Sequence, residues 1–119
     1  MALLKMKFLA LYARDIYKTA KVYECLGMSF DEERHGAGPV HLACDTVGQV
    51  IEIYPGLETP SRSALLGFEV TDLEATRQNL RDAGAVIVKD IALVADERRL
   101  VAGDPDGREI FVQEAKHPK

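Results

Sequence analysis

Few residues of this chain offer a nitrogen or sulfur ligand to a metal ion or could exchange electrons, and their spacing matches no compact binding motif. The two cysteines, Cys25 and Cys44, lie too far apart for a CxxC redox pair or a zinc knuckle. Among the three histidines, His35 precedes a strand-like run, His41 lies within it and His117 lies in the tail. Because a single histidine in a strand is more often structural than a ligand, these residues alone do not predict a metal centre.

The composition is that of one globular domain spanning residues 1–119. Apolar residues make up 47% of the chain and charged residues 29%, which is too apolar for a disordered protein. The 15 Lys and Arg against 19 Asp and Glu give a net charge of -4. This balance argues against nucleic acid as a partner, since binding phosphates needs a basic face, and it suits a cationic ligand.

The N-terminal stretch is apolar, but charged residues interrupt it at positions 5, 7 and 14. It does not reach the roughly 18 uninterrupted apolar residues of a membrane helix. No small-residue cleavage site of a signal peptide follows it. We therefore expect a cytoplasmic protein that does not enter a membrane.

The elements that must position any site come from an internal repeat. ARDIYKTAKVYECLG (13–27) and VTDLEATRQNLRDAG (70–84) align without a gap. Each segment has an aspartate where a helix would begin and a glycine just after its end. The repeat predicts helices over 15–26 and 72–83.

Strand-like runs flank both helices, so the predicted order of elements in each half is strand, helix, strand, strand, strand. With so few helices, a doubly wound parallel sheet is excluded. We predict a first module over 1–56, a linker over 57–63 and a second module over 64–119. The strands are predicted near 5–12, 28–33, 39–45, 49–54, 64–70, 86–90, 98–102 and 108–114.

A βαβββ unit used twice in a chain of this length resembles the vicinal oxygen chelate superfamily, which includes glyoxalase I, bleomycin-resistance proteins and ring-cleaving dioxygenases. YARDIYKTAKVYECLGM (12–28) is similar to the first strand and helix of that family, and VTDLEATRQNLRDAGA (70–85) is similar to the second. DPDGREIFVQE (104–114) is similar to its final turn and strand. The resemblance implies an α+β fold whose two modules form cup-shaped mixed sheets. It also implies a homodimer in which a second copy completes the clefts.

In metal-dependent members of that family, the first and last strands of each module supply four ligands. The resemblance places these positions at Phe8, Glu52, Leu65 and Phe111. Phenylalanine and leucine have no lone pair to offer a cation, and one carboxylate does not hold a divalent ion alone. We therefore expect no metal at these positions and no cofactor.

Strand alternation divides the side chains between two faces of each sheet. When the family's inward positions are carried across, one face is uniformly apolar, as a sheet face beneath helices should be. The other face is aromatic and acidic and would line the cup. Aromatic rings and carboxylates together favour planar or cationic organic molecules. The predicted ligand-binding residues are Phe8, Tyr12, Glu52, Tyr54, Leu65, Glu69, Glu109 and Phe111.

Two functions of different class follow from these residues. The first is a metal-independent binding protein, similar to the bleomycin-resistance branch, that sequesters a planar or cationic small molecule without turnover. The second is a lyase, isomerase or dioxygenase with a relocated site. That site would be a metal held by Glu52, Glu109 and His41, or Glu52 alone as a general base. An interaction module without a small-molecule ligand is a third interpretation.

Overall fold

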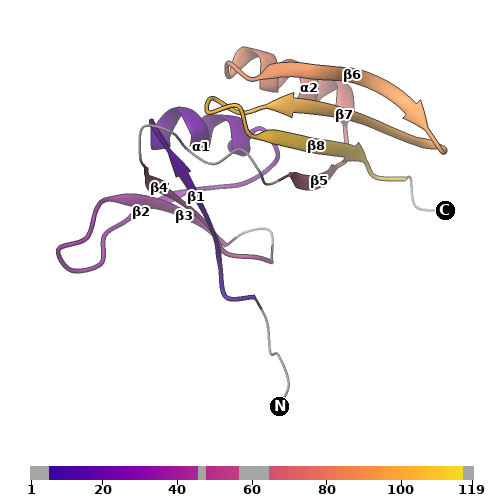
Figure 1. Ribbon diagram of the computed structural model, residues 1–119. Helices are drawn as coiled ribbons and strands as arrows, with labels where there is room; N and C mark the ends of the chain where they lie inside the picture. The colour runs from indigo at the N-terminus through magenta and orange to yellow at the C-terminus, as the bar shows by residue number, and fades with distance from the viewer. Residues whose placement is uncertain (1–5, 46–47, 57–64, 117–119) are drawn as a thin grey trace.

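The computed structural model describes residues 6–45, 48–56 and 65–116, and it contains the two predicted βαβββ modules (Figure 1). Each module forms a four-stranded sheet, in the order β1-β4-β3-β2 and β5-β8-β7-β6. The pairs β1–β4 and β5–β8 are parallel and the other pairs are antiparallel, so both sheets are mixed. The predicted linker over 57–63 lies outside the described residues. The elements are β1 (Leu9–Ala13), α1 (Ile16–Glu24), β2 (Asp31–Glu33), β3 (His41–Cys44), β4 (Ile51–Pro55), β5 (Leu66–Val70), α2 (Leu73–Asp82), β6 (Val86–Val94), β7 (Glu97–Gly103) and β8 (Glu109–Glu114).

Both helices begin and end as the repeat predicts. The Asp15 carboxylate accepts hydrogen bonds from the backbone amides of Tyr17 and Lys18 at 3.0 and 3.1 Å. Asp72 caps α2 through the amide of Ala75 at 3.0 Å. These bonds satisfy amides that the first helical turn leaves without partners. A glycine in the left-handed conformation follows each helix, with φ of +97° at Gly27 and +93° at Gly84.

No helix within the described ranges is long and apolar enough to cross a membrane.

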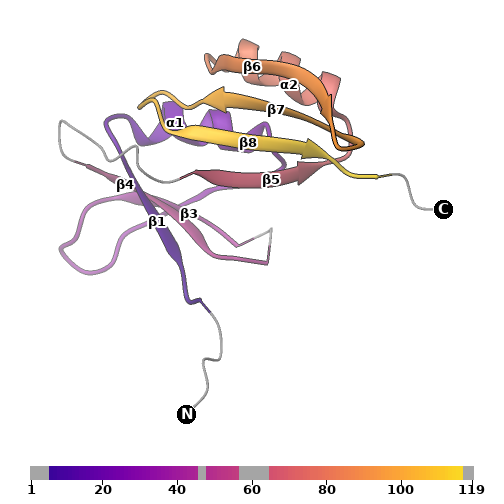
Figure 2. The ribbon, with the colours of Figure 1, turned by 45° about the vertical axis from the view of Figure 1, so that its right-hand side comes forward.

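Each helix covers one face of its own sheet. α1 packs on β1, β3 and β4, and α2 packs on β6, β7 and β8, which Figure 2 shows with α2 behind the sheet. The predicted division of faces is confirmed, because the side chains beneath the helices form the core, among them Leu11, Ile53, Ile110 and Val112. The opposite face of each sheet is left open for function.

The β6–β7 hairpin of module two is longer than the sequence predicts. β6 continues to Val94 and β7 starts at Glu97, so a two-residue turn joins them. The turn residues Ala95 and Asp96 have φ of +51° and +65°, a geometry that usually selects glycine or asparagine. The sequence carries no such turn signal here, which is why the predicted strands stop short. In module one, β2 covers three residues rather than the six predicted.

A buried polar network joins the two modules. It is built on the DPDG turn (104–107), which precedes β8. The Tyr23 hydroxyl of α1 donates to Asp104 Oδ2 at 2.9 Å, and the Arg108 guanidinium donates to the same carboxylate oxygen. Arg108 Nη2 also donates to the carbonyl oxygen of Tyr12 at 2.6 Å. Burial, and then the neighbouring Asp104 charge, hold the pKa of the Tyr23 hydroxyl well above its usual value. The network therefore fixes β1, and with it Tyr12, relative to the second module.

Candidate functional site

The open face of the first sheet carries a line of four rings that we call the aromatic row: Tyr12, Tyr54, His41 and His35. The β1–β4 register places Tyr12 opposite Tyr54, with ring centroids 5.9 Å apart. His41 stacks on the other side of Tyr54 at 4.3 Å and an interplanar angle of 13°. The His35 ring lies 5.1 Å from that of His41. The row thus crosses β1, β4 and β3 and ends in the β2–β3 loop.

Two carboxylates flank the histidine end of the aromatic row. Oε1 of Glu33 and Oε2 of Glu52 each lie 3.4 Å from Nε2 of His41. Nε2 of His35 lies 3.6 Å from the same oxygen of Glu33. Desolvation and the nearby Glu52 charge raise the pKa of the Tyr54 hydroxyl, so this hydroxyl stays protonated at neutral pH. The face is therefore aromatic at one end and acidic at the other.

The predicted residues of the first module lie on or beside this face. Tyr12 is 55% exposed and Tyr54 is half-buried. Glu52 is only 8% exposed. Phe8 lies just before β1 and is exposed. The structure thus brings Tyr12, Tyr54 and Glu52 together.

The predicted residues of the second module lie on the other sheet. Glu69 is on β5, Glu109 and Phe111 are on β8, and Leu65 lies exposed just before β5. The guanidinium of Arg99 lies 5.5 Å from the Phe111 ring centroid, within the range of a cation–π contact. A hollow of about 290 Å³ beside this pair is also lined by a lysine, Lys89. The hollow is therefore lined by two cationic side chains, Arg99 and Lys89, together with the carboxylate of Asp90.

The eight predicted residues therefore form two groups, one on each sheet. Glu109, which the sequence offers as a third ligand beside Glu52 and His41, does not belong to the cluster around His41. The residues that join these two instead are Glu33 and His35. The sequence signal for them is Glu33-x-His35 followed by His41, which a β2–β3 hairpin with Glu33 opposite His41 would bring together.

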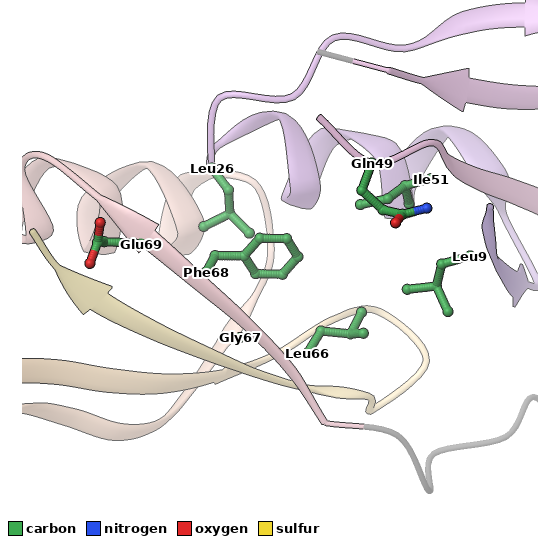
Figure 3. Close-up of a pocket in the computed structure, with 8 residues that line it drawn as sticks. All are labelled: Leu9, Leu26, Gln49, Ile51, Leu66, Gly67, Phe68 and Glu69. Atoms are coloured by element: carbon green, nitrogen blue, oxygen red, sulfur yellow. The ribbon is translucent and has the colours of Figure 1, made fainter. Parts of the chain in front are cut away.

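A cleft of about 390 Å³ lies between the modules (Figure 3). Side chains of β5, including Phe68, point toward those of β1, β4 and the end of α1. Of the predicted ligand-binding residues, Glu69 is the one that lines it. Most of its walls belong to the helix-covered face, as at Leu9, Ile51 and Leu66, so the cleft is continuous with the core rather than with the aromatic row.

The residues at the four ligand positions of the vicinal oxygen chelate family do not fit a metal ion. Phe8 and Leu65 are exposed hydrocarbon side chains, and Leu65 is 63% exposed. The Phe111 ring is instead in contact with the Arg99 cation, which would repel a metal ion. Glu52 remains the one donor of the four, so we derive no chemistry from a metal held in that manner.

Comparison with known proteins identifies the fold. No protein-family model matches the sequence, and no curated protein matches it. An integron cassette protein from the mobile metagenome of Vibrio cholerae is 26% identical, with 98% of each chain covered and a TM-score of 0.66. A glyoxalase/bleomycin resistance protein/dioxygenase family enzyme from Burkholderia phytofirmans PsJN is 21% identical, with 92% of this chain and 98% of that chain covered and a TM-score of 0.73.

TnmS3, an antibiotic binding protein from Streptomyces sp. CB03234, is 19% identical, with 98% of this chain and 99% of that chain covered and a TM-score of 0.75. These structural neighbours include an enzyme of the glyoxalase/bleomycin resistance protein/dioxygenase family and an antibiotic binding protein. The two βαβββ modules and two mixed four-stranded sheets of this chain are the glyoxalase fold.

Proposed function

We propose that this chain binds a planar, cationic organic molecule on the aromatic row, without a metal at the family's four ligand positions. The observation that carries the proposal is the open ring surface of Tyr12 and Tyr54 beside the carboxylate of Glu52. Ring faces attract flat cations through stacking and cation–π interactions. A carboxylate that is only 8% exposed adds attraction that solvent screens weakly. The antibiotic-binding neighbour TnmS3 shows that the fold can serve as a binding protein.

We further propose that the protein is a homodimer. The open faces of both modules expose large apolar side chains, including Phe8 at 49% and Leu65 at 63%, and exposed apolar patches commonly mark interfaces. The acidic end of the aromatic row on one chain complements the Arg99 and Lys89 face of another. A second copy would thereby enclose the aromatic row. Light scattering should give twice the chain mass at micromolar concentration, and Leu65→Glu should shift it toward the monomer; a monomeric wild type would refute this arrangement.

Ligand binding is tested by a thermal-shift screen of the full chain. The probes are planar aromatic amidines and ammonium compounds, with carboxylates on the same ring systems as controls. A ligand that binds the folded state raises the melting temperature, so the cations should raise it and the anions should not. Tyr12→Ala should remove the shift, whereas Tyr17→Ala, which changes a similarly exposed tyrosine on α1, should retain it. No shift from any cation, or equal shifts from both ring series, would contradict the proposal.

Glu52 also supports a second candidate function, proton abstraction from a bound substrate. Its carboxylate is largely buried and lies 3.4 Å from an imidazole nitrogen that could receive or return a proton. In that case Glu52→Gln would abolish turnover and leave ligand affinity nearly unchanged. If Glu52 only binds, the same change would weaken affinity and no turnover would be found in wild type.

A further inference from the structure

We propose that Glu33, His35, His41 and Glu52 form a binding site for a divalent transition-metal ion of the zinc type, within module one. The site uses the loop end of the β2–β3 hairpin and the neighbouring strand β4. Glu52 is the only residue that it shares with the four ligand positions of the vicinal oxygen chelate family. The proposal does not depend on binding of an organic ligand.

The distances within the cluster fit a coordination sphere. One donor atom from each of the four residues lies within 4.8 Å of every other. The closest pairs are 3.4, 3.4 and 3.6 Å apart. Zinc bonds to imidazole nitrogen and carboxylate oxygen are about 2.0–2.1 Å, so the edge of a zinc tetrahedron is about 3.3–3.4 Å. At these distances Nε2 of His41 makes no hydrogen bond to either carboxylate.

His41 provides the most specific observation. Its side chain is 1% exposed, and Nε2 has no hydrogen-bond partner although it faces the carboxylates of Glu33 and Glu52. Nδ1 lies 3.3 Å from the carbonyl oxygen of Pro39. A proton on Nδ1 directed at a backbone carbonyl is the usual arrangement of a metal-binding histidine, and it leaves the Nε2 lone pair free. The Nε2 lone pair and the two carboxylates face one another at a buried position, where a cation between them is needed to offset their mutual repulsion.

A proton on Nε2 is the alternative cation, and the geometry disfavours it. When an imidazolium donates to a carboxylate, the nitrogen and oxygen are about 2.7–2.9 Å apart. Here both carboxylate oxygens lie 3.4 Å from Nε2. The two oxygens are also equally distant from Nε2, as ligands around a shared ion would be. A metal ion therefore explains the arrangement better than an ion pair.

The other acidic cluster of the described residues provides a contrast. Asp72, Glu74 and Glu114 also bring three carboxylates together. There Arg98 forms ion pairs with Glu74 and Glu114, and the amide of Leu73 donates to Glu114. These partners neutralise the cluster. Around His41, by contrast, the described ion-pair partners of both glutamates are histidines.

The donor set and its exposure define which ions would bind and from which side. Two imidazoles with two carboxylates favour zinc and similar transition metals over magnesium or calcium, which prefer all-oxygen sites. The side chains of His35 and Glu33 are 75% and 42% exposed, whereas those of His41 and Glu52 are 1% and 11% exposed. An ion would therefore enter from the β2–β3 loop and rest against two buried donors.

The experiment uses the full chain treated with a chelator and dialysed, then titrated with Zn²⁺ by calorimetry. We expect one equivalent per chain, no comparable binding of Mg²⁺, and affinity that falls as the pH is lowered because protons compete for the ligands. Cobalt provides a second readout, since Co²⁺ in a four-coordinate site shows strong visible absorption. The absence of saturable Zn²⁺ binding would overturn the proposal.

Variants locate the ion. His41→Gln and Glu52→Gln should each weaken Zn²⁺ binding by roughly 100-fold or more, since even changes outside the ligand set cost about 10–100-fold. His35→Ala changes an exposed side chain, so it should weaken binding without loss of folding even if the buried variants unfold. Glu109→Gln and His117→Ala are the controls and should leave affinity unchanged.

Two results would show that the ion binds elsewhere. One is undiminished Zn²⁺ affinity in folded His35→Ala and Glu52→Gln, and the other is a loss in either control. Binding of the aromatic cations to chelator-treated protein is measured separately. It decides the proposed function whatever the outcome for zinc.

Discussion

The two modules share one fold but have different open faces. Both have the same order of elements, aspartate caps and glycines after their helices, and both bury aliphatic side chains beneath the helix. On the open face, module one has the aromatic row with glutamates, and module two has Phe111 beneath Arg99. The comparison indicates that the helix-covered face specifies the fold, which leaves the open face free to differ.

The modules also differ in how they balance negative charge. In module two, arginines pair with the carboxylates, as Arg98 does with Glu74 and Arg77 does with Asp90. In module one, Glu33 and Glu52 face imidazoles rather than permanently charged guanidinium groups. Module one is therefore the half whose electrostatics a ligand can change.

The largest expected effect comes from breaking the connection between the modules at Asp104. Asp104→Ala would leave the buried Arg108 cation without its partner and the Tyr23 hydroxyl without its acceptor. Removing one partner of a buried ion pair costs about 3–5 kcal/mol. We expect the free energy of unfolding in urea to fall by this amount, with Asp45→Ala, at an exposed position, as the control. A loss below about 1 kcal/mol would mean that the network does not couple the modules.

The next largest effect is expected on ligand binding, and it distinguishes the open faces of the two modules. Glu52→Gln should weaken binding of an aromatic cation by tenfold or more, because loss of a desolvated charge pair costs about 2–5 kcal/mol. Glu109→Gln, at an exposed position of the other sheet, should have little effect. Calorimetric titration measures both. Equal losses would mean that the two faces act as one site, and no loss in either would remove Glu52 from the site.

The two modules also differ in how the aspartate at the start of each helix caps it. Asp15 accepts two backbone hydrogen bonds and Asp72 accepts one. Replacing an aspartate cap by alanine lowers the free energy of unfolding by about 0.5–2 kcal/mol. We expect the loss to be near the upper end of this range for Asp15→Ala and near the lower end for Asp72→Ala. Urea unfolding of both variants tests this order, and the reverse order would show that the carboxylates act beyond capping.

The smallest effect concerns acid pH. The hydrogen bond from Arg98 lowers the pKa of Glu74, and that from Arg77 lowers the pKa of Asp90. A lowered pKa in the folded state means that the unfolded chain binds the proton more tightly, so this stabilisation is present above the unfolded pKa and lost as the pH falls through the folded one. Both carboxylates are exposed, so the contribution is small. Melting temperatures from pH 7 to 3 should fall slightly less in Glu74→Gln and Asp90→Asn than in wild type; an unchanged slope would contradict this.

Sequence patterns predict the helices, the order of helices and strands along the chain, and the buried face because those depend on local signals. Asp15 and Gly27 delimit α1 through their own chemistry, and strand alternation assigns Ile53 to the core. The extended β6–β7 hairpin could not be predicted, because Ala95 adopts a left-handed conformation that alanine does not signal.

The candidate site was predictable only in part. The positions of Tyr12, Glu52 and Tyr54 follow from strand alternation within β1 and β4 once the inward positions of the resembling family are carried across. The approach of Glu33 and His35 to His41 depends on the register of the β2–β3 hairpin, which a loop of seven residues does not specify. Residues that form a cluster across an irregular loop cannot be paired by spacing alone.

The DPDG turn also bears on whether either module could exist as a separate protein. A chain that ended after β4 would keep the Tyr23 hydroxyl and the Tyr12 carbonyl but lose the groups that satisfy them. Such a fragment would also uncover the part of its core that packs against β5. We therefore expect the two halves to depend on each other for stability, and the chain to unfold in a single transition rather than one half at a time.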